Sequence, residues 1–292
     1  MKTFINCHIG ALGDFILTLP ALQSLRNSLG KIHLLGLGRP DYMQLAVAFG
    51  LLDSYLDFES RIMIDFLDGA SLPPEIDSVA GGVFWFANAG KPISLLKKKA
   101  ILPVIEIPPI PLPGMHTAQY YFKTVQTHFR LTTPFVHSFC LASDVPHHHS
   151  ALIHPGSGSP RKNYSLQFYR DIADELARLG YVDVRFIFGP VERETINPHD
   201  LSGARIEQPE NAAALAQLLA GAALYIGNDS GVSHLSGILG TRTIALYKNT
   251  DPRVWGALGQ EVKHIVAADE RTAFSEIMRV LGNEQDWQVL EK

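Results

Sequence analysis

The sequence has only two cysteines among its 292 residues, Cys7 and Cys140, which are too few for a disulfide framework. Both lie in apolar stretches, where a free thiol behaves as a small hydrophobic group, so both are predicted to be buried and reduced. No apolar run approaches the roughly 18 residues that a membrane-spanning helix needs. The stretch MKTFINCHIGALGDFILTLPAL begins like a signal peptide, but Asp14 and two glycines interrupt it. We therefore expect an uncleaved strand, turn and helix in a cytoplasmic protein.

The sequence also lacks a strong excess of either charge. Its 25 Lys and Arg residues stand against 29 Asp and Glu residues, a formal net charge of -4 at pH 7 with no strongly basic block. General nucleic-acid binding is therefore not expected. Internal repeats and low-complexity segments are absent as well. What the chain has is 46% hydrophobic residues and a length above the usual single-domain range, which together predict two domains with sizeable cores.

Short apolar runs alternate with segments of helical periodicity along the chain. The first set predicts strands at 3–7 and 31–35, a helix at 15–29, and less distinct elements as far as about residue 130. The polar, proline-containing segment LASDVPHHHS (141–150) predicts a linker, so the expected domains are 1–145 and 150–292.

The alternation restarts after the predicted linker. The expected strands are 151–155, 184–188, 223–227, 243–247 and 263–267, and the expected helices are 166–179, 212–220, 231–239 and 272–281. Two such sets indicate two parallel α/β sheets with helices on both faces. Ligands of such sheets bind beyond the carboxyl ends of the strands.

The first of three unusual turns is HIGALGDF, residues 8–15. Gly10 and Gly13 would let the backbone approach a ligand, although a full G-x-G-x-x-G fingerprint is absent. Asp14 lies where the helix begins. It either caps the helix and complements its dipole, or it contacts a ligand.

The second turn is IHPGSGSPRKNYS, residues 153–165. Ser157, Gly158 and Ser159 offer hydroxyls and backbone N–H groups, and Lys162 offers a mobile cation, a combination that suits phosphate oxygens. The pattern is not a P-loop, and a flexible, solvated Gly/Ser loop is the alternative.

The third turn lies in YIGNDSGVSHLSGILG, residues 225–240. Ser230 and Gly231 fall at a predicted helix N-terminus, whose unpaired N–H groups and partial positive charge can hold an anion. Asp229 either caps this helix or contacts a ligand hydroxyl. His234 either faces the ligand or is a satisfied core histidine.

Together with YKNTDPRVWGALG (247–259), these turns make the sequence resemble glycosyltransferase family 9, best known for the ADP-heptose:lipopolysaccharide heptosyltransferases. The segments GALGDFILTLPALQSLR, HPGSGSPRKNYSLQFYRDIADEL, FGPVERE and IGNDSGVSHLSGILGTRTIALY carry the resemblance. It implies an α/β protein of the GT-B class, with two Rossmann-like doubly wound domains facing across a cleft. The first would bind mainly the acceptor and the second the nucleotide-sugar donor. Family members invert the anomeric centre and need no metal, so neither a metal site nor a cofactor besides the donor is expected.

The resemblance also assigns roles to residues. Asp14 matches the expected general base, which takes the proton of the acceptor hydroxyl; because an ordinary Asp is a weak base, it would act mainly by position. Lys162 is expected to neutralise the leaving diphosphate as a catalytic group. Glu192 matches an acidic position near the nucleoside, and Asp229 and His234 match D-[ST]-G-x-x-H. The full set expected to bind the donor is Ser157, Gly158, Ser159, Glu192, Asp229, Ser230, Gly231, His234 and Thr250.

The sequence departs from the family in three places. Many relatives have Lys-x-Trp where this chain has Lys162-Asn163-Tyr164. The loop that usually reads Gly-Pro-Thr-Asp-Pro here has Lys248-Asn249 before the Thr, either an extra cation beside the diphosphate or a sign of a different sugar. Cys7-His8 stands where an Arg or Lys often precedes the first glycine motif.

The acceptor side gives fewer indications. Gly13 is one expected acceptor-binding residue. His116 and Lys123, seven apart on one predicted helix, share a face and are the others. Lys97-Lys98-Lys99 could meet a phosphate-bearing saccharide or the inner membrane surface, but a solvated helix face is the alternative. His147-His148-His149 lacks the spacing of a helical metal site.

The leading hypothesis is an inverting, metal-independent transferase that moves heptose from ADP-heptose to a lipopolysaccharide core or related glycan, in the cytoplasm or at the cytoplasmic face of the inner membrane. Its partners would be the nucleotide sugar and a glycan or lipid-linked glycan. Two alternatives remain: a family member with another nucleotide sugar, and a catalytically silent nucleotide-sugar-binding protein, against which Asp14 and Lys162 argue. A nicotinamide dehydrogenase would need the full glycine fingerprint and a ribose-binding acid after the first turn.

Overall fold

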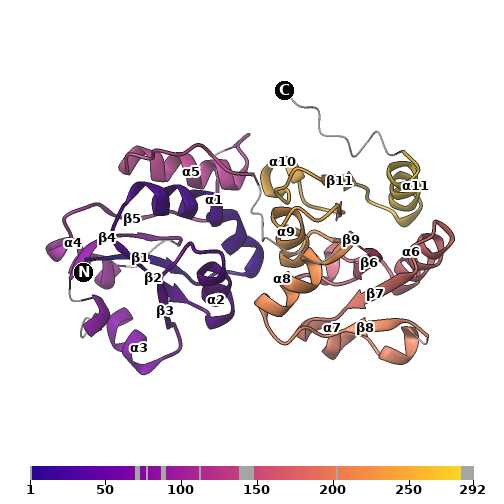
Figure 1. Ribbon diagram of the computed structural model, residues 1–292, viewed down its shortest axis with the longest axis horizontal. Helices are drawn as coiled ribbons and strands as arrows, with labels where there is room; N and C mark the ends of the chain where they lie inside the picture. Colours follow the sequence, from indigo (N-terminus) through magenta and orange to yellow (C-terminus); the bar gives the residue numbers. More distant parts are fainter. Residues whose placement is uncertain are drawn as a thin grey trace. The chain divides into compact units, whose positions relative to one another are not determined.

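The computed structural model describes residues 2–69, 73–76, 78–86, 90–111, 113–137, 148–201 and 203–283. The chain divides into two compact units, Met1–Val136 and His137–Lys292 (Figure 1). Most of the predicted linker, residues 141–147, lies outside the described residues, as does Cys140.

The first unit is built on a five-stranded parallel sheet with the order β3-β2-β1-β4-β5. Every residue of the central strands β1 and β4 is buried, as expected for a parallel sheet covered on both faces. The strands are β1 (Thr3–His8), β2 (His33–Gly38), β3 (Ser54–Asp57), β4 (Val79–Phe84) and β5 (Val104–Glu106). The helices are α1 (Leu12–Ser28), α2 (Pro40–Ala48), α3 (Arg61–Leu67), α4 (Gly90–Lys99) and α5 (Thr117–His128).

Helices cover both faces of this sheet. α3 and α4 pack on the face that carries Ile5, Cys7 and Leu35, while α1 packs with α2 and α5 (Figure 1). The burial of Cys7 agrees with its prediction, and this burial raises the pKa of its thiol. The strand predicted at 31–35 is observed at His33–Gly38, because it starts later and continues through Gly36 to Gly38. A Cβ on Gly36 would lie within 2.7 Å of neighbouring side chains, so glycine here permits close packing.

The second unit contains a six-stranded parallel sheet with the order β11-β10-β9-β6-β7-β8. Counted along this unit, the order is that of the dinucleotide-binding Rossmann sheet, and it reverses between β6 and β9. The strands are β6 (His148–His154), β7 (Asp183–Ile187), β8 (Arg205–Glu207), β9 (Ala222–Asn228), β10 (Thr243–Tyr247) and β11 (Val262–Val266). The helices are α6 (Leu166–Arg178), α7 (Pro190–Thr195), α8 (Ala212–Ala220), α9 (Gly231–Ile238), α10 (Pro252–Trp255) and α11 (Glu270–Leu281).

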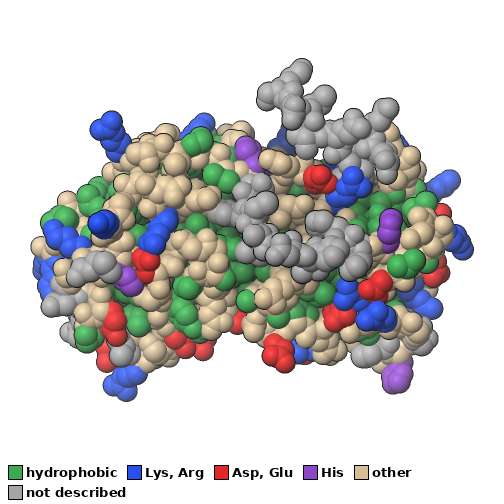
Figure 2. Space-filling model, in the orientation of Figure 1, with side chains coloured by type: hydrophobic (Ala, Val, Ile, Leu, Met, Phe, Trp, Pro, Cys, Tyr) green, Lys and Arg blue, Asp and Glu red, His purple; other side chains and the backbone are tan. Residues whose placement is uncertain are grey.

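The core of the second unit lies between its sheet and two helices. Apolar residues at helical spacing on α6 and α11 pack against alternate residues of the strands, and α8 and α9 lie on the other face (Figure 1). Acidic and basic side chains are interspersed over the surface in view, as the balanced composition suggests (Figure 2). Within the described part of the chain, no helix combines the length and hydrophobicity of a membrane span.

Candidate functional site

In the second unit, the predicted donor residues follow four adjacent strands of the sheet. The β6–α6 loop (residues 155–165) follows β6, Asp229 and Ser230 follow β9, Thr250 lies in the loop after β10, and Glu192 lies on α7 after β7. Because the strands are parallel, these residues gather at one edge of the sheet, around the point where the strand order reverses. This is the position at which open α/β sheets bind their ligands.

Two asparagines hold the β6–α6 loop in place. Asn228 Nδ2 donates to the carbonyl oxygen of Pro155 at 2.7 Å and to Asn163 Oδ1 at 3.2 Å. Its Oδ1 accepts from the hydroxyl of the buried Tyr169 at 2.5 Å. The Ser157 hydroxyl lies 2.6 Å from Asn163 Oδ1. Sequence reasoning missed both asparagines, although a polar side chain at the end of the apolar strand ALYIGN was a usable signal.

The loop residues differ in exposure. Ser157 is buried, Ser159 is half-buried, and Gly158 is exposed with no other atom within 4 Å of the place where its Cβ would lie. The Ser157 hydroxyl is engaged within the loop, and its oxygen also lies 3.3 Å from the Ser159 backbone nitrogen. The exposed backbone around Gly158 is thus the part of the loop that a ligand can approach without displacing a side chain.

Lys162 forms the shortest ion pair among the predicted donor residues. Its Nζ lies 2.7 Å from Asp229 Oδ2, and His234 Nε2 lies 3.9 Å from the other oxygen of the same carboxylate. Asp229 and His234 are buried, whereas Lys162 is about one-third exposed. The interpretation of Asp229 as a helix cap is wrong, because Ser230 is the N-cap of α9 and accepts from the backbone of Ser233 at 3.4 Å. Asp229 instead fixes the ammonium of Lys162 beside the N-terminus of α9, where Gly231 is the first helical residue.

A buried histidine connects Glu192 to this helix N-terminus. His154 Nε2 lies 3.4 Å from Glu192 Oε2, and its Nδ1 lies 3.4 Å from Ser230 Oγ. Glu192 also accepts from the backbone N–H of Gly189 at 2.7 Å. Burial by itself raises the pKa of Glu192, but His154 and the Gly189 N–H outweigh it and hold that pKa below its ordinary value. Glu192 is therefore a buried, fixed carboxylate that is ionised at neutral pH.

Gly156 makes room for the Glu192 side chain, because a Cβ at Gly156 would overlap Glu192 Oε1. We expect Gly156→Ala to destabilise the protein by about 1–3 kcal/mol, the usual cost of overpacking a buried site. The measurement is thermal unfolding followed by circular dichroism. Gly158→Ala, two residues away with open space around its Cβ, is the matched control and should leave the midpoint unchanged. Equal midpoints for both variants would contradict this role of Gly156.

The β10–α10 loop (residues 248–251) touches the β6–α6 loop. Lys248 Nζ donates to the carbonyl oxygen of Asn163 at 3.2 Å, and Asn249 Nδ2 donates to that of Arg161 at 2.7 Å. Thr250 is half-buried in the same loop. Lys248 and Asn249, which depart from the family pattern in this loop, therefore both contact the loop predicted to bind phosphate.

In the first unit, Asp14 lies in the first turn of α1, beside His8 at the end of β1. The N-cap of α1 is Ala11 and makes no side-chain capping bond, so Asp14 is not the cap residue. Asp14 Oδ2 and His8 Nε2 both lie 3.4 Å from the place where a Cβ on Gly10 would be. Burial, followed by the charge of Arg39, lowers the pKa of His8 to about 3, so its imidazole is neutral at pH 7.

Tyr121 of α5 is a further neighbour of Asp14. Its burial, followed by the negative charge of Asp14, raises its pKa above the ordinary range. His116 is the N-cap of α5, and its Nδ1 accepts from the backbone of Ala118 at 3.3 Å, so the helix begins one residue after it. Lys123 is exposed on α5, and Gly13 is half-buried in the first turn of α1. The first unit thus brings a neutral histidine and a phenol, neither of them predicted, to the surroundings of Asp14.

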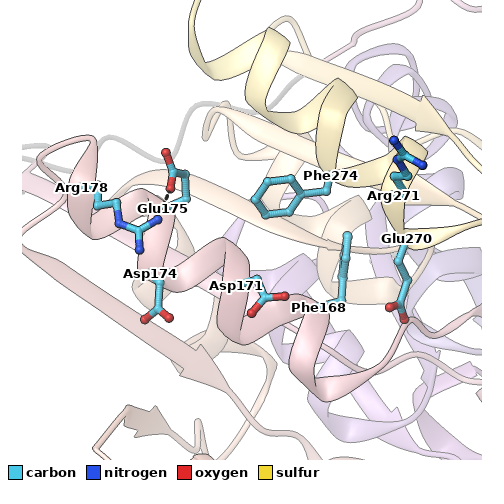
Figure 3. Close-up of a pocket in the computed structure, with 8 residues that line it drawn as sticks. All are labelled: Phe168, Asp171, Asp174, Glu175, Arg178, Glu270, Arg271 and Phe274. Carbon is cyan, nitrogen blue, oxygen red and sulfur yellow. Dashed lines mark hydrogen bonds and ion pairs between the residues drawn. The ribbon is translucent and has the colours of Figure 1, made fainter.

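A separate pocket of about 420 Å³ lies between α6 and α11 (Figure 3). None of the predicted site residues lines it. Four acidic and two basic side chains surround it together with two phenylalanines, so it does not suit an anionic diphosphate. Its lining residues are Phe168, Asp171, Asp174, Glu175, Arg178, Glu270, Arg271 and Phe274.

The lysine and histidine runs noted in the sequence are exposed where the structure describes their side chains. Lys97, Lys98 and Lys99 are exposed in the last turn of α4, where cations complement the helix dipole. His147 lies outside the described residues, and His149 is exposed. No group of three or more potential metal-ligating side chains is found in the part of the chain that the structure describes.

Comparison with known proteins assigns the chain to a family. The sequence pattern of glycosyltransferase family 9 (heptosyltransferase) matches residues 115–283, more than half of the chain. A putative glycosyltransferase of Haemophilus influenzae is 31% identical over 122 residues, 39% of this chain and 35% of that protein. Lipopolysaccharide heptosyltransferase 1 of Pseudomonas aeruginosa is 29% identical over 107 residues, 36% of this chain and 30% of that protein. The chain thus matches about a third of the length of these curated relatives.

A solved structure extends the likeness to both units. The E. coli heptosyltransferase WaaC with ADP superimposes with a TM-score of 0.72, covering 96% of this chain and 100% of that one at 15% identity. Such a likeness concerns the fold, and it confirms the predicted GT-B class of two parallel α/β sheets.

Proposed function

Because the chain belongs to glycosyltransferase family 9, we propose that it transfers heptose from ADP-heptose to a lipopolysaccharide core or related glycan, with inversion and without a metal ion. The observation that carries the proposal is the Lys162–Asp229 ion pair at the N-terminus of α9. It fixes a cation where the strand order reverses, beside a helix N-terminus, whose first N–H groups have no partner within the helix. These are the groups that a leaving diphosphate needs when protein charge alone stabilises it.

In the proposed reaction, the acceptor oxygen forms a bond to the anomeric carbon as the bond from that carbon to the β-phosphate oxygen breaks. Asp14 takes the proton of the acceptor hydroxyl. The electron pair of the broken bond stays on the diphosphate, which leaves as ADP beside Lys162 and the N–H groups of Ser230 and Gly231. Glu192 accepts hydrogen bonds from the ribose hydroxyls, and Asp229 and His234 orient the sugar or the diphosphate.

The adenine base and the heptose are supported by relatives rather than by side chains of this chain. The likeness to a heptosyltransferase solved with ADP favours ADP-heptose, and the likeness to lipopolysaccharide heptosyltransferase 1 favours a lipopolysaccharide acceptor. The second candidate is transfer from another nucleotide sugar. Lys248 supports this second candidate, because it departs from the family pattern and contacts the β6–α6 loop. We also propose that the protein works in the cytoplasm or at the cytoplasmic face of the inner membrane.

Thermal unfolding with nucleotides tests the proposed donor. A ligand that binds only the folded state at 100 times its Kd stabilises it by about 2.7 kcal/mol, and we expect this from ADP with EDTA present. For domains of this size such a gain raises Tm by roughly 5–10 °C. GDP and UDP at the same concentration are the controls. A larger shift with either control would support the second candidate, and no shift with any nucleotide would contradict a nucleotide-sugar donor.

A further inference from the structure

Lys248 occupies a defined position at the edge of the candidate donor site. It follows β10 directly, and its Nζ donates to the carbonyl oxygen of Asn163, the residue after Lys162. The same ammonium lies 5.2 Å from the centroid of the Tyr164 ring. Because an ammonium carries three N–H donors, one bond to a backbone carbonyl leaves it able to bind a further acceptor.

Tyr164 explains why the ammonium stays in this place. Its hydroxyl donates to the carbonyl oxygen of Ala267 at 2.5 Å, and its ring stacks on Phe168 with a centroid separation of 4.8 Å. The ring is therefore fixed, and the ammonium of Lys248 lies over it within the range of a cation–π contact. Lys248 is half-buried, so its side chain lies partly against the rest of the unit.

The balance of charge around the β6–α6 loop shows what this ammonium adds. The positive charge of Lys162 is offset by Asp229 at 2.7 Å, and Glu192 brings a second carboxylate to the same edge of the sheet. Among the described residues, Lys248 forms no ion pair with a carboxylate, in contrast to Lys162. The loop also carries Arg161, whose side chain is exposed. A nucleoside diphosphate brings at least two negative charges, which Lys162, already paired with Asp229, does not balance by itself.

We propose that Lys248 is a second cationic group of the donor site, one that binds the diphosphate of the nucleotide sugar and stabilises it as it leaves. This inference rests on the proposed function. Negative charge on the diphosphate increases as the glycosidic bond breaks, so a fixed cation interacts more strongly with the leaving group than with the intact donor. The competing explanation is that Lys248 only stabilises the β6–α6 loop through its contacts with Asn163 and Tyr164.

Binding of adenosine, AMP and ADP, measured by isothermal titration calorimetry, separates the two explanations. For Lys248→Met, which keeps an apolar stem over Tyr164, we expect ADP affinity to fall about ten-fold or more, as for a lost hydrogen bond to a charged group. Adenosine affinity should stay unchanged, because adenosine has no phosphate. Lys248→Arg should restore most of the ADP affinity, and raising the salt concentration should weaken ADP binding to wild type more than to Lys248→Met.

Arg161→Met is the matched control, since Arg161 is an exposed cation of the same loop. It should change ADP affinity far less than Lys248→Met does. Equal losses of adenosine and ADP affinity in Lys248→Met would show that Lys248 only holds the loop in place, and would overturn the inference. Unchanged ADP affinity in that variant would overturn it while leaving the proposed function intact, whereas failure of wild type to bind ADP would contradict both.

Discussion

Asp14→Asn is expected to lower kcat for glycosyl transfer by about a hundred-fold or more, the range typical of a lost general base. The substitution keeps the size of the side chain and removes its ability to take a proton. Donor affinity should persist, because the residues proposed to bind the nucleotide belong to the second unit. The measurements are transfer kinetics with the correct donor and acceptor, together with ADP binding by calorimetry.

The structure makes the alternative explanation easy to test. If Asp14 mattered only for the first turn of α1, its loss would cost stability and leave transfer nearly intact. Asp41 is the matched control, because it lies in the first turn of α2, the helix that follows the neighbouring strand β2, and is exposed. Asp41→Asn should therefore keep full transfer. Full transfer by a folded Asp14→Asn protein would refute the proposed base.

Two neighbours of Asp14 carry no formal charge. His8 is neutral at pH 7, since its pKa is lowered to about 3. The phenol of Tyr121 is also neutral, because burial and the charge of Asp14 raise its pKa. Neither neighbour therefore places a formal positive charge on Asp14 that would make its carboxylate a weaker base.

Helices and strands could be predicted from the sequence where a short stretch of residues carried the signal by itself. The helix 212–220 and the strand 243–247 have the predicted bounds, since each is a strongly apolar run between turn residues. The helices α2 and α3 were not predicted. They are short, and α2 begins at a proline that reads as a turn, although proline is well suited to a first helical position.

The site residues, too, could be predicted only where the sequence signal was local. Motif residues such as Lys162 and Asp229 could be found because the turns that carry them are distinctive, and the structure brings these two within 2.7 Å. His154 and Asn228 were missed because their partners lie far away in the chain: Asn228 bonds to Pro155 across 73 residues. Such pairs meet only after the strand order places β6 beside β9, and composition does not reveal that order.

Lys162→Ala is expected to lower kcat/KM for the donor by roughly ten-fold to a thousand-fold, as for other charged groups that stabilise a leaving group. Two effects contribute. The variant loses the cation that neutralises the diphosphate, and it leaves the buried carboxylate of Asp229 without its 2.7 Å partner, close to where the phosphates are proposed to bind. Initial rates over a range of donor concentrations give the loss, and thermal unfolding shows whether the variant is folded.

A double variant separates these two effects. Lys162→Ala combined with Asp229→Asn removes both charges of the pair, so it should bind ADP better than Lys162→Ala alone if repulsion by the unpaired carboxylate contributes. It should still transfer slowly, because the cation that stabilises the departing diphosphate is missing. Arg161→Ala removes an exposed positive charge one residue earlier and should keep near-normal kinetics, which controls for net charge. Normal kcat/KM in a folded Lys162→Ala protein would exclude Lys162 from the donor site, and the proposed electrostatic mechanism would then have to place its charge elsewhere.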